Sequence, residues 1–275
     1  DCNELIIKQL KEYGNLLFSE IKSHSYTHCW RCKTPLLLRA TKQWFLAISK
    51  IRDELIDKNK NIEWVPEWIG SGRFENWLRN ARDWCISRQR YWNTPLPVWK
   101  CKCGNIEVIG SIDELCSKSI EKIDSEMIDL HRPFIDKVKL RCKCGNEMER
   151  VKDVMDVWLD SGCASWANLG YPHKKDIFHN LFPADFITEG SDQTRGWFYS
   201  LLVCSDIAFD EIAYKKVLYH GFTLDEDGRK MSKSLGNVID PFDIINTYGA
   251  DILRYYMIWA SVPWEDLRFS YNGIE

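Results

Sequence analysis

Two short cysteine pairs constrain the fold of this chain more than any other feature of its sequence. Cys101 and Cys103 are followed by a glycine, and the same Cys-x-Cys-Gly pattern returns at Cys142 and Cys144. Glycine lets the backbone turn so that its amides face the thiolates, and four thiolates around Zn²⁺ make a closed structural site. The pairs therefore predict that residues 100–149 form a separate zinc-binding insert. Free buried cysteines are the alternative.

The other cysteines and the composition indicate the compartment and the partners. The chain has 11 cysteines, mostly in tight pairs, and no secretory signal is recognisable, which favours a cytoplasmic protein that binds metal over one with disulfides. Cys29 and Cys32 form a further half-site without an obvious partner pair, or two packed thiols. No apolar run approaches the roughly 20 residues that span a bilayer, so no membrane contact is expected. With a formal net charge of −3, a polyanionic partner would have to be met by local basic patches.

Apolar periodicity predicts an α/β fold around a parallel sheet. Strands are expected over 184–190 and 216–224, and helices over 191–209 and 248–260. Alternating strands and helices imply parallel strands, and proteins with such sheets have their sites at the carboxyl ends of the strands.

Helical spacing also appears in two earlier segments. A helix is expected over 3–14 with Gly14 as its C-cap, and another in the first part of 72–92, where Phe74, Trp77 and Leu78 share one face. Residues 93–99 contain two prolines and must be extended.

The segment GRKMSKSLGN, residues 228–237, sets three cations and two hydroxyls between two glycines. A solvated surface turn is the simplest interpretation of such a stretch. The alternative is a phosphate clamp, because ammonium groups on flexible stems can follow negative charge as it migrates between phosphate oxygens. Gly228 and Gly236 would let such a loop close over its ligand.

The surroundings of this loop carry a resemblance to a known family. "KMSKS", preceded by "HGFTLDEDGR" and followed by "LGNVIDP", resembles the second signature of class I aminoacyl-tRNA synthetases. "RDWCISRQRYW", "LHRPFIDKV", "DVMDVWLDSG" and "FPADFITEGSDQTRGWFYSLL" are similar to the isoleucyl family in its archaeal and eukaryotic form. The resemblance covers nearly all 275 residues. It implies the C-terminal half of a Rossmann-like catalytic domain with an inserted zinc-ribbon-like module.

The resemblance also divides the chain. It implies the exit of an editing insertion over 1–45, a partial nucleotide-binding domain over 46–99 and 150–260, the zinc insert over 100–149, and the start of a stem region over 261–275. No His-x-Gly-His motif of the family is present, and no anticodon-binding domain follows, so the chain is expected to be an internal piece that is inactive alone. Asn93 stands where the family has glycine, and asparagine is the least costly replacement if φ is positive there.

The resemblance assigns roles to particular residues. It places Lys233, supported by Lys230, on the phosphates of ATP, and Trp158 and Trp197 around the isoleucine side chain. Glu189 is expected on the adenylate; on the residue alone, a charge at a helix N-terminus is the alternative. The full set expected to bind ATP or the adenylate is Glu189, Gly190, Asp192, Gln193, His220, Lys230, Ser232 and Lys233.

The function expected from these features is ATP-dependent activation of L-isoleucine and its transfer to tRNA(Ile), with structural Zn²⁺ and with Mg²⁺ bound to ATP. The complete enzyme is expected to be a monomer. Valyl and leucyl enzymes share the loop and are one alternative. A zinc-ribbon nucleic-acid-binding module is another, although the acidic residues between the cysteine pairs argue against it.

Overall fold

A computed structural model describes residues 2–29 and 31–275. Their contacts separate into two units, Asp1–Lys42 and Gln43–Glu275. In the smaller unit, α1 (Cys2–Glu12) confirms the helix predicted over 3–14, and Gly14 follows it with φ of 68°. α1 buries none of its residues. The Cys29 amide donates to the Thr34 carbonyl oxygen at 2.8 Å and forms a tight turn.

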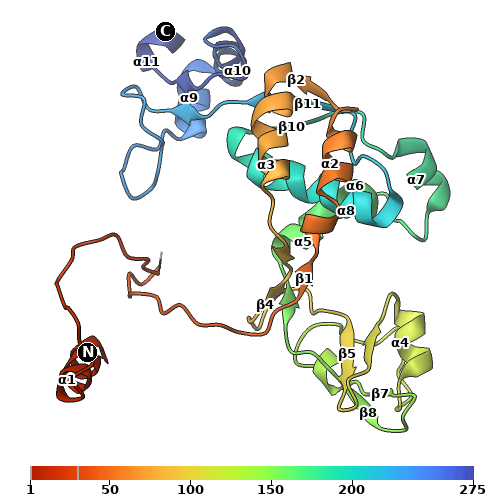
Figure 1. Cartoon of the computed structure of the whole chain (residues 1–275). Coiled ribbons are helices and arrows are strands. Elements are labelled where there is room, and N and C mark those ends of the chain that lie inside the picture. Colours follow the sequence, from red (N-terminus) through yellow and green to blue (C-terminus); the bar gives the residue numbers. More distant parts are fainter. Residues whose placement is uncertain (1, 30) are drawn as a thin grey trace. The chain divides into compact units, whose positions relative to one another are not determined.

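The larger unit contains a parallel three-stranded sheet in the order β10 (Ile187–Gly190), β11 (Lys216–His220) and β2 (Glu63–Val65) (Figure 1). α8 (Trp197–Phe209) connects β10 to β11. The chain therefore forms the parallel strand–helix–strand unit that the periodicity predicts, and the predicted α/β fold class is confirmed.

The main hydrophobic core lies against this sheet. α8 is buried continuously from Phe198 to Asp206, as expected for a helix surrounded by protein on all sides. Phe74 and Leu78 are fully buried and Trp77 is partly buried, which confirms the predicted apolar face. The other helical segments of this part of the chain are η1 (Ile48–Lys50), α2 (Arg52–Asn59), the π-helical η2 (Ile69–Phe74), α3 (Glu75–Arg79) and η4 (Ser191–Arg195).

Two short antiparallel strand pairs are formed by segments that precede and follow the insert. They pair β1 (Phe45–Leu46) with β3 (Trp84–Cys85), and β4 (Ser87–Arg88) with β9 (Val154–Met155). After β9 come α5 (Val157–Gly162), α6 (Ala164–Ala167) and α7 (Lys175–Leu181). A second apolar cluster around Trp166 and Phe178 packs against the end of α8.

The insert has its own sheet and core. Its strands are antiparallel in the order β6 (Ile106–Val108), β5 (Val98–Cys101), β8 (Glu147–Arg150) and β7 (Leu140–Arg141). Helical segments α4 (Ile112–Lys118) and η3 (Ile135–Lys137) accompany it. Trp99, Leu115 and Met148 are almost completely buried among themselves and their neighbours.

The segment after β11 corrects one prediction. The single strand expected over 216–224 is broken into β11 and β12 (Thr223–Leu224), because Gly221 passes very close to another backbone segment. A Cβ atom at Gly221 would lie 2.2 Å from the Glu265 carbonyl oxygen. β12 pairs instead with β13 (Leu267–Arg268).

Three helices complete the chain. α9 (Pro241–Tyr248) was not predicted, α10 (Ala250–Trp259) confirms the helix expected over 248–260, and α11 (Tyr271–Ile274) is short. They share a small core with β13 that includes Ile244, Tyr256 and Leu267. Among the described residues, no helix is long and apolar enough to cross a membrane.

Candidate functional site

Three of the predicted residues meet at the carboxyl ends of β10 and β11. The register sets Gly190 opposite His220. A Cβ atom on Gly190 would lie 3.0 Å from Asp192 Oδ1 and 3.5 Å from His220 Cε1, so glycine leaves room for both side chains. Asp192 and His220 are exposed, as is Glu189, which precedes Gly190 on the strand. This edge therefore presents two carboxylates and an imidazole to solvent.

An exposed arginine on η2 supports this edge. Arg73 donates from Nε to Thr194 Oγ1 at 3.2 Å and from Nη1 to the Tyr219 hydroxyl at 3.3 Å. Thr194 is fully buried. Arg73 thereby ties η2 to the loop after β10 and to β11. Arg73 was not among the predicted residues, because its partners lie far along the chain and no spacing rule links them to it.

Two tryptophans and a glutamine surround Gly196. Gln193 Oε1 accepts a hydrogen bond from the Trp197 amide at 2.8 Å. Trp197 donates from its indole to the Ser161 carbonyl oxygen at 3.0 Å. A Cβ atom on Gly196 would lie 2.6 Å from Gln193 Oε1 and 3.2 Å from Trp158 Cη2. Trp158, which is 40% exposed, thus lies beside Gln193 and close to the start of α8.

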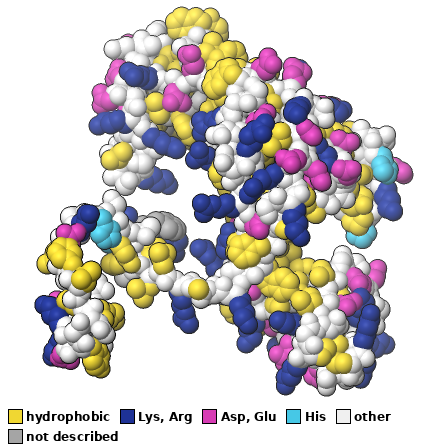
Figure 2. All heavy atoms as spheres, viewed as in Figure 1, with side chains coloured by type: hydrophobic (Ala, Val, Ile, Leu, Met, Phe, Trp, Pro, Cys, Tyr) yellow, Lys and Arg dark blue, Asp and Glu magenta, His cyan; other side chains and the backbone are white. Residues whose placement is uncertain are grey.

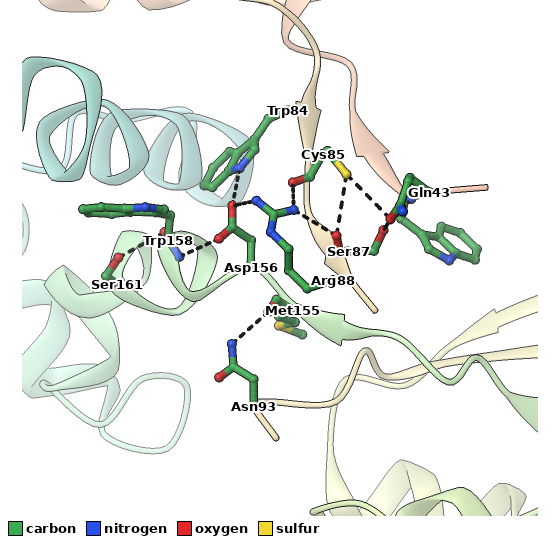
Figure 3. Close-up of polar contacts among 11 residues, drawn as sticks. Gln43, Trp84, Cys85, Ser87, Arg88, Asn93, Met155, Asp156, Trp158 and Ser161 are labelled. Atoms are coloured by element: carbon green, nitrogen blue, oxygen red, sulfur yellow. Dashed lines mark hydrogen bonds and ion pairs between the residues drawn. The ribbon is translucent and has the colours of Figure 1, made fainter. Parts of the chain in front are cut away.

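Asp156 fixes the start of the helix that carries Trp158. Figure 3 shows Trp84 and Arg88 converging on its carboxylate. Oδ2 accepts from the Trp84 indole at 2.9 Å and from Arg88 Nη2 at 2.7 Å. Oδ1 caps α5 by accepting from the Trp158 amide at 3.3 Å. Asp156 is only 4% exposed, so this buried carboxylate is well satisfied. Asp156 was not among the predicted residues, although an aspartate directly before a helix is a known N-capping signal.

Asn93 and Asp160 lie near this cluster. The Asn93 side chain donates to the Met155 carbonyl oxygen at 2.9 Å. Among the described non-glycine residues only Lys33 and Asp210 have positive φ, so Asn93 carries no left-handed strain. Burial raises the pKa of Asp160, and the nearby Asp156 charge adds to that effect while a hydrogen bond to Thr94 opposes it.

The lysine loop is braced at its base by Asp225. This residue is 7% exposed and accepts hydrogen bonds from the Arg229 amide at 2.6 Å and from Asn237 Nδ2 at 2.8 Å. The Asn237 hydrogen bond, with help from Arg229, holds the pKa of Asp225 below its usual range. Asn237 also accepts from the Ser232 amide at 2.9 Å. Gly228 and Gly236 have φ of 79° and 68°, which only glycine adopts easily.

The two lysines lie beyond this brace. Lys230 Nζ is 4.0 Å from the centroid of the Phe222 ring, and Lys233 is exposed. Within 2–29 and 31–275, no hydrogen bond, ion pair or ring contact joins either lysine to Glu189, Asp192 or His220. The predicted site residues therefore form separate groups, one at the strand ends and one on the loop.

The four insert cysteines form a compact group. Their sulfur atoms all lie within 4.8 Å of one another, with Cys101 to Cys144 at 3.6 Å and Cys103 to Cys142 at 3.7 Å. Four thiolates about 2.3 Å from one Zn²⁺ would be about 3.8 Å apart in a tetrahedron, so the group can hold a metal ion. The glycines after the pairs, Gly104 and Gly145, have φ of 94° and 87°, as the predicted turns require.

Hydrogen bonds prepare this group for a cation. The Asn146 backbone amide, together with the neighbouring thiols, lowers the pKa of Cys144 to about 6. In the described part of the chain this is the only group of three or more potential metal ligands. Cys29 and Cys32 therefore have no further metal ligands beside them there. The Thr34 hydroxyl lowers the pKa of Cys32 to about 7.

Comparisons with known proteins identify the family. The fold resembles Mycobacterium tuberculosis methionyl-tRNA synthetase bound by methionyl-adenylate, with a TM-score of 0.60 and 19% identity over 90% of this chain and 39% of that one. A family model described as tRNA synthetases class I (I, L, M and V) matches residues 11–270, and the chain belongs to this family.

Closer relatives carry one amino-acid specificity in their names. The isoleucine–tRNA ligase of Methanopyrus kandleri is 53% identical over 289 residues, which cover 100% of this chain and 27% of that protein. The expected resemblance to the isoleucyl family is thus confirmed. A LeuRS–tRNA–LeuAMS complex from Agrobacterium radiobacter K84 matches with a TM-score of 0.50 and 27% identity, over 70% of this chain and 26% of that one. The chain spans about a quarter of the length of the curated relatives it matches.

Proposed function

We propose that the protein containing this chain activates L-isoleucine with ATP and Mg²⁺ and transfers it to tRNA(Ile). The observation that carries the proposal is the grouping of Gly190, Asp192 and His220 at one strand edge, with Gln193 and Trp197 directly after it in the chain and Trp158 next to Gly196. The names of the relatives support isoleucine as the amino acid. The adenylate and tRNA named with the solved structures support the same substrate classes.

The strand edge would bind the adenylate. Glu189 offers a carboxylate to the α-ammonium group of isoleucine, and Asp192 and Gly190 leave a polar, open surface beside it. The Gln193 carbonyl oxygen is held by the Trp197 amide, and its amide nitrogen donates one hydrogen bond to Asp192 Oδ2 at 3.1 Å, so its second N–H would be directed to the amino acid or the ribose. His220 would face the nucleotide.

Trp158 and Trp197 would enclose the isoleucine side chain. The Trp197 ring is held by the hydrogen bond from its indole to the Ser161 carbonyl oxygen, whereas for Trp158 it is the backbone amide that Asp156 holds at the start of α5. Flat aromatic walls suit a branched apolar side chain, because burial rather than hydrogen bonding must recognise it.

The loop would act as the phosphate clamp. Attack on the α-phosphate expels pyrophosphate, so negative charge moves between phosphate oxygens. The ammonium groups of Lys233 and Lys230 can follow this charge. Ser232, whose amide is held by Asn237, would keep the loop in shape between them. The cysteine group would hold a structural Zn²⁺. We further propose that the complete protein is a cytoplasmic monomer.

Isoleucine-dependent ATP–pyrophosphate exchange by the complete protein tests the clamp. We expect Lys233→Ala to lower exchange roughly 10²–10³-fold while isoleucine still binds, because one preorganised charge at a developing anion is worth that much. Lys230→Ala should act in the same direction but less. Lys175 is an exposed lysine on α7, so Lys175→Ala is the matched control, and its exchange rate should stay within about twofold of the wild type. Unchanged exchange in Lys233→Ala would mean that the loop is a surface turn.

Replacing isoleucine by valine or leucine in the same assay tests the amino acid. A missing methylene changes recognition by only about 1–3 kcal/mol, a limit for which isoleucyl enzymes are the reference case. Isoleucine should therefore be preferred over valine by a limited factor. A preference for valine or leucine would move the chain to another member of the family.

A further inference from the structure

An exposed pair of stacked rings lies on the surface outside the site described above. The Trp92 and His131 rings are 4.8 Å apart at their centroids and only 3° from parallel. They come from two separate segments, one directly before the insert and one within it. Trp92 is nevertheless 70% exposed, so most of its surface still faces solvent. An indole that is already stacked on one side and open elsewhere can accept a further flat ring.

The His131 ring of this pair is held in place by Asp129, a residue of the same loop. Asp129 Oδ1 accepts a hydrogen bond from the His131 amide at 2.8 Å and lies 2.9 Å from ring Nδ1. Both contacts hold the pKa of Asp129 below its usual range. The two segments are also tied together, because Arg132 donates from Nη1 to the Arg90 carbonyl oxygen at 3.0 Å. The stack is therefore preorganised, which lowers the entropy cost of binding.

The surroundings of the stack combine aromatic rings with two arginines and two carboxylates, because Asp129 contacts His131 and Asp136 pairs with Arg132 Nε at 2.9 Å. The Arg132 guanidinium lies 5.1 Å from the centroid of the Tyr91 ring, and Tyr91 is 59% exposed. Arg90 is exposed, and within the described ranges no carboxylate pairs with its guanidinium. Figure 2 shows side chains of both signs of charge over the visible face of the molecule.

We propose that Trp92, stacked on His131, is a platform for an unpaired base of single-stranded RNA, with Arg90 beside it for a phosphate. Exposed aromatic rings next to arginines are the arrangement by which proteins bind unstacked bases, whatever the base. The open face of one indole suits a planar ring such as a base. The proposal rests on the proposed function, in which RNA is a substrate.

Fluorescence anisotropy with a labelled six-nucleotide oligoadenylate tests the platform on the complete protein. We expect Trp92→Ala to weaken binding roughly 5-fold to 100-fold, the range that stacking of one base on an aromatic side chain supplies. Trp92→Phe keeps a stacking ring and should remain within about threefold of the wild type. An abasic strand of the same length keeps the phosphates and should bind the wild type as weakly as oligoadenylate binds Trp92→Ala.

The outcomes separate this proposal from the proposed function. Isoleucine-dependent ATP–pyrophosphate exchange needs no RNA, so Trp92→Ala should leave it unchanged even where RNA binding falls. Equal affinity of wild type and Trp92→Ala for oligoadenylate would overturn the platform, and so would equal affinity of the wild type for the abasic strand. Loss of exchange in the wild type would instead overturn the proposed function.

Discussion

Removing the Asp156 carboxylate should destabilise the protein more than any exposed charge would. Asp156→Ala leaves the Trp84 indole without its acceptor, and a hydrogen bond to a charged group contributes about 1.5–3 kcal/mol. Loss of the cap on the Trp158 amide adds about 1 kcal/mol. Arg88 is 39% exposed at its side chain and can be rehydrated, so its pairing adds only about 0–1 kcal/mol. Because these partners share one carboxylate, their losses do not add fully, and we expect about 3 kcal/mol.

Denaturant unfolding followed by tryptophan fluorescence measures this loss. Asp156→Asn keeps an acceptor for Trp84 and should lose less than Asp156→Ala. Asp185→Ala is the control, because Asp185 is 88% exposed at its side chain and, among the residues the structure describes, pairs only with Lys215 at the surface; this predicts a loss below about 0.5 kcal/mol. In exchange assays Asp156→Ala should raise the KM for isoleucine more than the KM for ATP, because Asp156 caps the helix that carries Trp158. A loss in Asp156→Ala no larger than in Asp185→Ala would refute this reasoning.

Two further predictions concern the metal group and the loop brace. Metal analysis of the freshly purified protein should find one zinc per chain, and Cys142→Ser should abolish it and open the insert; no zinc in the wild type, with all four thiols freely titratable, would contradict the site. Asn237→Ala should destabilise the loop at pH 7, and this loss should shrink below about pH 4, because the lowered pKa of Asp225 stabilises the fold only while the carboxylate is ionised. Thermal unfolding at pH 7 and pH 3 measures the difference, and an equal loss at both values would argue against the brace.

Short-range features of the molecule could be predicted from the sequence. The glycines after the cysteine pairs, the cap at Gly14 and the apolar face of Phe74 and Leu78 all follow from residues a few positions apart. The strand–helix–strand unit followed from periodicity alone. Such features depend on local backbone geometry, which the local sequence determines.

Features that join distant segments could not be predicted. Arg73 reaches Thr194 and Tyr219, and Asp156 reaches Trp84, across separations that no periodicity encodes. The strand break at Gly221 depends on the backbone of Glu265. In each case the partner is chosen by the packing of the sheet and its helices, so the contact becomes visible only once the fold is known.

Long-range contacts of the same kind explain how the lysine loop can be anchored at its base while Lys230 and Lys233 stay free to bind a ligand. Gly221 lets the chain pass the Glu265 backbone, and directly after it the Phe222 amide donates to Asp266 Oδ1 at 2.7 Å while the Phe222 carbonyl oxygen accepts from Leu267 at 2.8 Å. The base of the loop is therefore tied to Asp266 and to the first residue of β13, and it is braced again at Asp225. Beyond that base, in the part of the chain that the structure describes, neither Lys230 nor Lys233 pairs with a carboxylate. A polyphosphate could then recruit both ammonium groups without first breaking an ion pair, and the fixed base would limit the entropy lost when the loop closes.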